Sequence, residues 1–281
     1  MAFGNRLIDI GGGGGAGWTL ENAVQIATGD LGRSYAGYRA IDISADGTRL
    51  GLAMDHPLSQ DLTMYSLSTP FDITTLSVLN ETGSPNLSNK NPRGGKFNLD
   101  GTKFSWSQSN NSARSYETIT MSTPYNVTTI TGQVSSGWYF PGGTGSFGAG
   151  MSQDGSQFYG IGNESGGATV WRIQGWNLAT PYEPASTRTT SFYADAFTPT
   201  PPDYVHGIQF DPSGHSLFFL MNDQNFKQYY CSTPFDGTTA VDTGITLSTP
   251  LVNKSDFCFS PDGKYLYAVG YYNTVVQYQL Y

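Results

Sequence analysis

Five short turns place a carboxylate or a hydroxyl group beside a glycine at regular intervals along the chain. The glycines are Gly47, Gly101, Gly155, Gly214 and Gly263, and the residue before each is Asp, except for Ser in the fourth turn. Carboxylates bind hard cations when several converge on one point, but these stand one per repeat. An acid followed by glycine also suits a tight turn, because glycine accepts a positive φ. We therefore predict that these residues form turns and bind no metal.

A second phrase alternates with the turns. Ser-Thr-Pro-Phe-Asp occurs at Ser68–Asp72 and Ser232–Asp236, with variants at Ser122–Asn126 and Ala179–Glu183 and a fainter copy at Glu21–Gln25. We call this the repeat phrase. It follows a short apolar strand and precedes a Thr-rich segment, such as 73–79, which we expect to be the outermost strand of a sheet. A repeat of about 50 residues built from short strands is typical of a β-propeller, and five copies predict five blades.

The last copy is incomplete, which predicts how the ring closes. Three strands are expected in it, at 256–259, 265–269 and 274–280, and the chain then ends. The segment 18–28 aligns with 65–75, so residues near 23–27 should supply the missing outer strand. Such closure removes an open sheet edge. We therefore predict an all-β protein with a single five-bladed propeller over residues 18–281, preceded by a Gly-rich segment over residues 1–17.

The composition limits the classes of function. The net charge is −8, only 13% of residues are charged, and aromatic residues make up 14%. An acidic surface disfavours nucleic acid, and no apolar stretch is long enough to span a membrane. The N-terminal apolar stretch is short and interrupted by Asp9, so no signal peptide is expected. Cys231 and Cys258 lack metal-binding spacing and are expected to be buried free thiols.

The paired phrases resemble one group of propeller proteins. The turn with Asp-Gly, followed by Tyr-x-Leu-Ser-Thr-Pro-Phe-Asp at Tyr65–Asp72 and by a Thr-rich strand, is similar to a repeat family of virion and tail-associated proteins of bacteriophages, especially marine ones. The run of five glycines leading to Trp18-Thr-Leu also looks like the start of such chains. The resemblance implies a propeller with a role on a virus particle, and it brings no catalytic motif. Ala179–Glu183 and the fourth turn, Asp-Pro-Ser-Gly, depart from the pattern.

Enzymes on this fold collect their chemistry where the innermost strands begin. The aligned residues there are Arg39, Arg93, Phe147, His206 and Ser255. With their neighbours, this mouth contains a single carboxylate, whereas glycosidases need a pair and lactonases need a cation cage. The basic residues could attract an anion or form salt bridges. We expect no enzyme and no cofactor or metal, with a glycosidase- or lactonase-like enzyme as the alternative.

Two long connections carry aromatic residues that suit a binding surface. Trp138, Tyr139, Tyr193 and Tyr204 offer flat faces to sugar rings, although they could equally cap the blades or contact a neighbouring subunit. Together with Arg39, Arg93 and His206 they are the candidate ligand-binding residues. A free, lectin-like glycan-binding propeller is a further alternative.

The Gly-rich N-terminal segment has its own apolar residues. They are Phe3, Leu7, Ile8 and Ile10, which belong to no expected blade. A short apolar segment on a glycine hinge suits docking to another chain. The sequence thus predicts a non-enzymatic phage virion protein, tail-associated or decorating the capsid surface, with a structural or host-surface-adhesive role. Its partners would be other virion proteins and host-surface glycan, and it would be made in the host cytoplasm and displayed on the particle.

Overall fold

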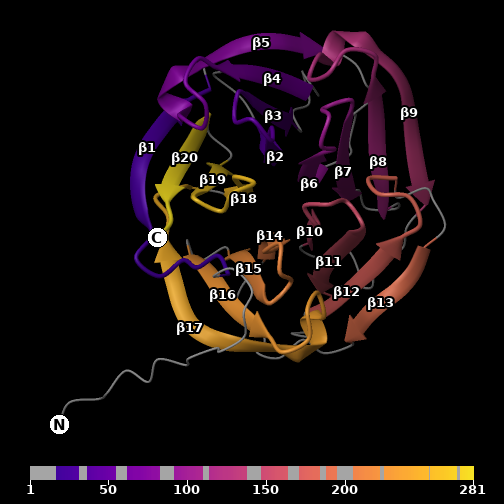
Figure 1. The fold of residues 1–281 in the computed structure, drawn as a ribbon, viewed down its shortest axis with the longest axis vertical. Coiled ribbons are helices and arrows are strands. Elements are labelled where there is room, and N and C mark those ends of the chain that lie inside the picture. The colour runs from indigo at the N-terminus through magenta and orange to yellow at the C-terminus, as the bar shows by residue number, and fades with distance from the viewer. Residues whose placement is uncertain are drawn as a thin grey trace.

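The computed structural model is a ring of five antiparallel sheets, each of four strands. It describes residues 17–31, 37–54, 62–82, 92–109, 114–137, 147–163, 171–183, 188–194, 205–221, 225–252, 254–270 and 273–281. The sheets stand around a common axis with their first strands innermost and their fourth strands at the rim (Figure 1). The predicted five-bladed β-propeller is therefore confirmed.

Four blades are continuous in sequence, and we number them in chain order. Blade 1 contains β2 (Tyr38–Ile43), β3 (Arg49–Met54), β4 (Leu62–Leu67) and β5 (Leu76–Thr82). Blade 2 contains β6 (Pro92–Phe97), β7 (Lys103–Ser109), β8 (Arg114–Met121) and β9 (Ile130–Gly137). Blade 3 contains β10 (Phe147–Met151), β11 (Gln157–Asn163), β12 (Trp171–Leu178) and β13 (Arg188–Ala194). Blade 4 contains β14 (Val205–Phe210), β15 (Ser216–Met221), β16 (Asn225–Cys231) and β17 (Ala240–Ser248).

The fifth blade is built from both ends of the chain, and we call it the composite blade. It contains β18 (Lys254–Phe259), β19 (Tyr265–Gly270), β20 (Thr274–Gln279) and β1 (Val24–Asp30). The indigo strand β1 lies beside the yellow strand β20 in Figure 1, and the two pair antiparallel from Val24 opposite Gln279 to Asp30 opposite Thr274. The predicted closure is confirmed, with the strand three residues longer at its end than expected.

Each turn and the repeat phrase that follows it form one packing unit. Gly47 has a φ of 71°, and a Cβ there would clash with the ring of Phe71, which covers the glycine. The same ring-on-glycine contact joins Tyr125 to Gly101, Tyr182 to Gly155, and Phe235 to Gly214. These aromatic residues themselves have positive φ values of 55–63°. The proline before Phe71 suits the first corner of such a turn, so the phrase both ends the third strand and fixes the turn beside it.

The last residue of the repeat phrase caps a short helical turn. Asp72 accepts a hydrogen bond from the Thr74 backbone N–H at 2.9 Å, and a 3₁₀ turn, η1, follows at Ile73–Thr75. Asn126 and Asp236 cap η2 (Val127–Thr129) and η3 (Gly237–Thr239) in the same way. The expectation of a strand over 73–79 was thus wrong at its start. The capping side chain satisfies backbone donors that an extended chain would leave open at this corner.

In the composite blade, Trp18 takes the place of the aromatic residue of the repeat phrase. Its ring covers Gly263 and lies 4.7 Å from the ring of Phe259. Thr19 accepts a hydrogen bond from the Glu21 N–H, as Asp72 does from Thr74. Segment 18–20 is therefore the structural counterpart of 71–73. The alignment of Trp18 with Tyr65 was wrong by six residues, because short polar phrases align in more than one register.

Glutamines on two third strands clamp the phrase of the next blade. The Gln277 side chain donates to the Phe71 carbonyl oxygen at 2.7 Å and accepts from the Ile73 N–H at 3.2 Å. Gln228 makes the same pair of bonds to the Trp18 carbonyl oxygen and the Leu20 N–H, at 3.2 and 2.9 Å. These matched clamps confirm the equivalence of the two segments and join neighbouring blades.

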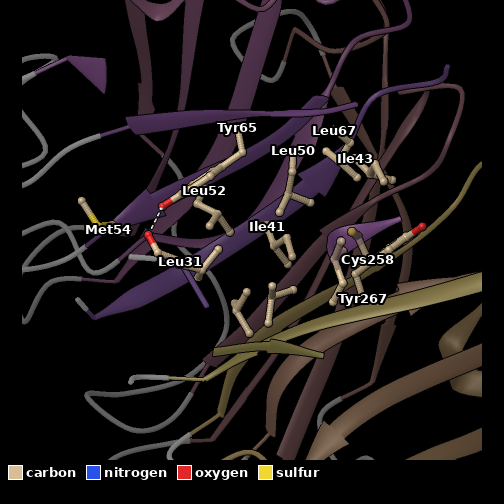
Figure 2. Packing of buried hydrophobic residues seen from close by; sticks show 13 residues of the cluster. Leu31, Ile41, Ile43, Leu50, Leu52, Met54, Tyr65, Leu67, Cys258 and Tyr267 are labelled. Atoms are coloured by element: carbon tan, nitrogen blue, oxygen red, sulfur yellow. Dashed lines mark hydrogen bonds between the residues drawn. The ribbon is translucent and has the colours of Figure 1, made fainter. Parts of the chain in front are cut away.

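The hydrophobic core lies between the blades, because each sheet is covered on both faces. Figure 2 shows the cluster between blade 1 and the composite blade, where Ile41 and Leu52 meet Cys258 and Tyr267. The Tyr65 hydroxyl donates to the Leu31 carbonyl oxygen at 3.1 Å within this cluster. Strands buried on both faces carry runs of apolar residues, as the fully buried β15 does. Cys231 and Cys258 are buried free thiols, as predicted.

The fourth turn departs from the others by exchanging two roles. In the first turn, the Ser44 hydroxyl accepts from the Arg49 N–H and the Asp46 carboxylate accepts from the Thr48 N–H. In the fourth turn, the carboxylate of Asp211 takes the first of these roles and the hydroxyl of Ser213 takes the second. Both versions satisfy the same backbone donors, so the predicted turn survives the change.

Candidate functional site at the two channel mouths

The innermost strands of neighbouring blades lie close together around the axis. A Cβ at Gly94 would clash with the Ala149 carbonyl oxygen, and one at Gly150 would clash with the Ile208 carbonyl oxygen. Gly94 also has a φ of 59°, which favours glycine. Backbone groups of neighbouring blades are therefore in contact, and the two ends of the channel are the candidate sites. We call them the loop mouth, where the innermost strands begin, and the turn mouth, at the glycine turns.

A buried carboxylate joins three blades near the loop mouth. Asp256 of β18 is 2% exposed, and its Oδ2 accepts from the N–H groups of Ile41, at 3.0 Å, and Gly95, at 3.2 Å. These are backbone donors of β2 and β6, which have no further strand to pair with on the channel side. Burial raises the pKa of Asp256 to about 8, against the opposing effect of these hydrogen bonds and of the Arg93 charge. The carboxyl group is thus an internal clamp.

The predicted basic residues do lie at the loop mouth. Bulges interrupt the pairing of β2, β14 and β18 at Arg39, His206 and Ser255, respectively. Arg93 and His206 are half-buried, and the Arg93 charge acts on Asp256. A bulge interrupts the regular alternation of side chains along a strand, so the position of each of these residues in its strand departs from the period of two. The structure brings Arg93 toward a carboxylate already bound within the protein.

The predicted aromatic surface is only partly within the described residues. Tyr193 lies in β13 opposite Gln174, on the outer strand of blade 3, and is 43% exposed. Trp138, Tyr139 and Tyr204 lie outside the residues that the structure describes, as do Phe3, Leu7, Ile8 and Ile10. The side chain of Arg39 also falls outside the described part, although its backbone belongs to β2.

The turn mouth holds a cavity of about 270 Å³ that sequence reasoning did not anticipate. Five residues line this cavity from the same position of each glycine turn. We call them the collar: Ala45, Leu99, Gln153, Pro212 and Pro261. Four collar residues are apolar and Gln153 is polar. The repeat therefore places five residues at equivalent positions around the cavity. Because only Gln153 is polar, the hydrogen-bonding group of the collar lies on one side.

An ion pair forms the polar floor of this cavity. The Lys96 ammonium lies 3.3 Å from Asp42 Oδ1, and the two side chains are 9% and 1% exposed. Asp42 Oδ2 also accepts from the Phe97 N–H at 2.7 Å. Burial raises the pKa of Asp42, against the lowering effect of the Lys96 charge. The pair thus ties β2 to β6 and also presents charged groups to the cavity.

The sequence did contain a signal for these residues. Asp42, Lys96 and Gln209 share one repeat position, directly before the apolar residue that precedes the turn. Each interrupts an otherwise apolar or glycine-rich innermost strand. Alignment of the strand starts drew attention to the loop mouth, while polar residues at the strand ends indicated the turn mouth.

The described residues hold no group of three or more His, Cys, Asp or Glu side chains that could bind a metal ion. Within the same part of the chain, no helix is long and apolar enough to cross a membrane.

Comparisons with known proteins extend the description of the fold. No protein-family profile matches the chain, and no curated protein matches it. Among solved structures, a luciferin-regenerating enzyme is similar with a TM-score of 0.51 and 11% identity, over 90% of this chain and 95% of that one. A chain of a mitotic checkpoint complex has a TM-score of 0.48 and 13% identity, over 92% and 95%. A protein of unknown function from Desulfotomaculum acetoxidans has a TM-score of 0.44 and 10% identity, over 83% and 62%. At such identities the first of these supports the propeller fold alone.

Proposed function

We propose that this propeller is a non-enzymatic structural protein of a bacteriophage particle, located at the tail or on the capsid surface, with a role in assembly, in adhesion to the host surface, or in both. The proposal starts from the repeat phrase, which resembles that of phage virion proteins. It is further supported by the rim of the ring and by the use of the buried carboxylates.

The observation that carries the proposal is the character of the rim. All five outer strands expose apolar side chains, namely Val24 and Ile26 on β1, Val78 and Leu79 on β5, Val134 on β9, Tyr193 on β13 and Val241 on β17. Only four charged residues, Asp30, Glu81, Arg188 and Asp242, occur on these strands, and no lysine or proline does. Charged residues, especially lysine, and proline commonly protect free sheet edges from pairing with other chains. An unguarded rim suits a protein whose edges are covered by neighbouring subunits.

The buried acids support a binding or structural role over catalysis. Asp256 and Asp42, which lie on two innermost strands, both accept backbone hydrogen bonds from neighbouring blades. A carboxylate engaged in this way stabilises the ring and is poorly placed to exchange protons with a substrate. An enzyme that used either of these acids in catalysis would require these hydrogen bonds to break.

Attachment to the particle is assigned to the N-terminal segment, with its apolar residues Phe3, Leu7, Ile8 and Ile10. The test begins with quantitative mass spectrometry of purified particles from the phage that encodes the chain, which should contain it in stoichiometric amounts. Deletion of residues 2–14 retains Trp18 and β1, so the propeller should fold with an unchanged melting temperature while the particles lose the protein.

The matched control replaces residues 2–14 by a Gly-Ser linker of the same length. This linker keeps Phe3, Leu7, Ile8 and Ile10 at their original positions, and it should recover incorporation into the particles. Particles that carry the deleted protein at normal occupancy would place attachment on the propeller itself. Particles that lack the full-length chain would contradict the virion role altogether.

A further inference from the structure

The turn-mouth cavity contains more hydrogen-bonding groups than the protein itself uses. The Lys96 ammonium has three N–H donors, and its recorded protein partner is Asp42 Oδ1. The Gln153 side-chain oxygen is buried and has no hydrogen-bond partner among the described residues. A buried polar group without a partner destabilises the protein. Both groups line the same cavity, so a bound molecule could satisfy them together.

The floor also restricts the charge of that molecule. Lys96 and Asp42 compensate each other at 3.3 Å, so the floor has no net charge. An anion drawn to Lys96 would be repelled by Asp42, and a cation drawn to Asp42 would be repelled by Lys96. A neutral molecule with several hydroxyl groups avoids both penalties, because each hydroxyl can donate to a carboxylate or amide oxygen and accept from an ammonium group.

The walls and the size of the cavity narrow the class further. Phe97 and the collar residues Leu99, Pro212 and Pro261 give an apolar wall beside the polar floor. Sugar rings present C–H groups on their faces and hydroxyls at their edges, which matches this division. The cavity, at about 270 Å³, lies at the small end of the range of roughly 300–1,000 Å³ for ligand sites. It therefore suits a single ring rather than an extended oligosaccharide.

We propose that the turn mouth binds one neutral monosaccharide unit, free or at the end of a glycan, with Lys96 and Asp42 holding its hydroxyls from below and Gln153 accepting a hydroxyl at the collar. The site differs from the aromatic loop surface predicted from the sequence, and it stands independently of the virion role.

The experiment uses the full chain and two sets of probes. Saturation-transfer NMR and calorimetry with glucose, galactose, mannose and N-acetylglucosamine test the free sugars, and an array of glycans with neutral terminal residues tests the attached ones. Inorganic phosphate and sialic acid serve as anionic probes. We expect at least one neutral sugar to bind and neither anion to compete with it.

Three variants at the collar and one control on the outer strands locate the binding. Ala45→Trp fills the collar from an exposed position and should abolish binding, whereas Val241→Trp on the exposed rim is the matched control and should leave it unchanged. Gln153→Met keeps the side-chain length but removes the unpartnered acceptor, and should weaken binding about tenfold. Leu99→Trp, also exposed on the collar, replaces Ala45→Trp if that variant melts early.

The proposal is overturned if none of the neutral sugars binds in either format, which would make the site a hydrated cavity only. It is also overturned if phosphate or sialic acid binds in their place, or if binding survives both collar tryptophans. Binding of terminal glycan residues without the free sugars supports the proposal and assigns the attached form as the ligand.

Discussion

The composite blade and the four continuous blades have the same four-stranded pairing but are held together differently. In blade 1, the chain itself carries the repeat phrase from β4 to β5, and Phe71 must adopt a φ of 63° to make that corner. In the composite blade, the phrase is supplied by segment 18–20 from the other end of the chain. Trp18 covers its glycine without a positive φ.

This difference shows how an outer strand is held when the chain does not connect it directly to its sheet. Where the chain is continuous, the outer strand stays beside its sheet at little entropic cost. Where it is not, the outer strand is held by the same kinds of contact that blade 1 uses: β1 pairs along β20 as β5 pairs along β4, and Gln228 clamps the segment 18–20 as Gln277 clamps 71–73. Closure of the ring therefore depends on non-covalent contacts alone, whereas the chain itself connects the outer strand of every other blade to its sheet.

The largest effect should come from removing the closing strand. A chain that begins at Asp30 lacks Trp18 and nearly all of β1, and β20 becomes an open edge. We expect it to lose most of its cooperative unfolding transition in thermal and urea melts, because the core beneath β1 is exposed. The deletion of residues 2–14 is the control, since it retains the whole closing segment. Equal melting of the two shortened chains would contradict the role of β1.

The next largest effect should come from the aromatic ring that covers a turn glycine, which is Trp18 in the composite blade and Phe71 in blade 1. Trp18→Ala should destabilise the protein by about 3 kcal/mol, the usual cost of truncating a large packed ring. Phe71→Ala in blade 1 is the matched variant, since its ring also covers a turn glycine. Urea denaturation measures both. Similar losses would sharpen the equivalence of 18–20 with 71–73, whereas a negligible loss for Trp18→Ala would break it.

The smallest effect is a pH dependence assigned to Asp256. Its folded-state pKa is raised to about 8, above the unfolded value of about 3.9. Below about pH 4 both states are protonated, and above it only the unfolded state ionises freely, so stability falls as the pH rises toward 8. Between about pH 6 and 8 the loss is about 2 kcal/mol.

Asp256→Asn removes this titration, so its free energy of unfolding should vary less over the same interval, measured by urea melts at several pH values. Asp42, whose pKa burial also raises, is present in both proteins and does not affect the difference. Parallel pH profiles for the variant and the original chain would show that Asp256 is not the titrating clamp.

Much of the fold follows from local patterns that need no knowledge of distant contacts. The five glycine turns, the blade count and the missing outer strand are visible because turn chemistry and repeat spacing are local properties. The register of the closing segment is not visible in the sequence. Trp18-Thr-Leu matches Tyr65-Ser-Leu in residue type, whereas it matches Phe71-Asp-Ile in packing. Only the position of the ring over Gly263 distinguishes the two.

The site shows the same division. That Arg93 and His206 begin innermost strands could be read from the repeat, but Asp256 as a clamp between three blades could not, because its partners Ile41 and Gly95 lie far along the chain.

The sequence by itself determined the propeller, its five blades and its closure, since these depend on repeated local signals. Tertiary structure decided which polar residues meet at the turn mouth and that a cavity lies there. The physical reason is that Asp42, Lys96 and Gln153 come from three different blades, and only the close backbone packing of the innermost strands sets the space between them.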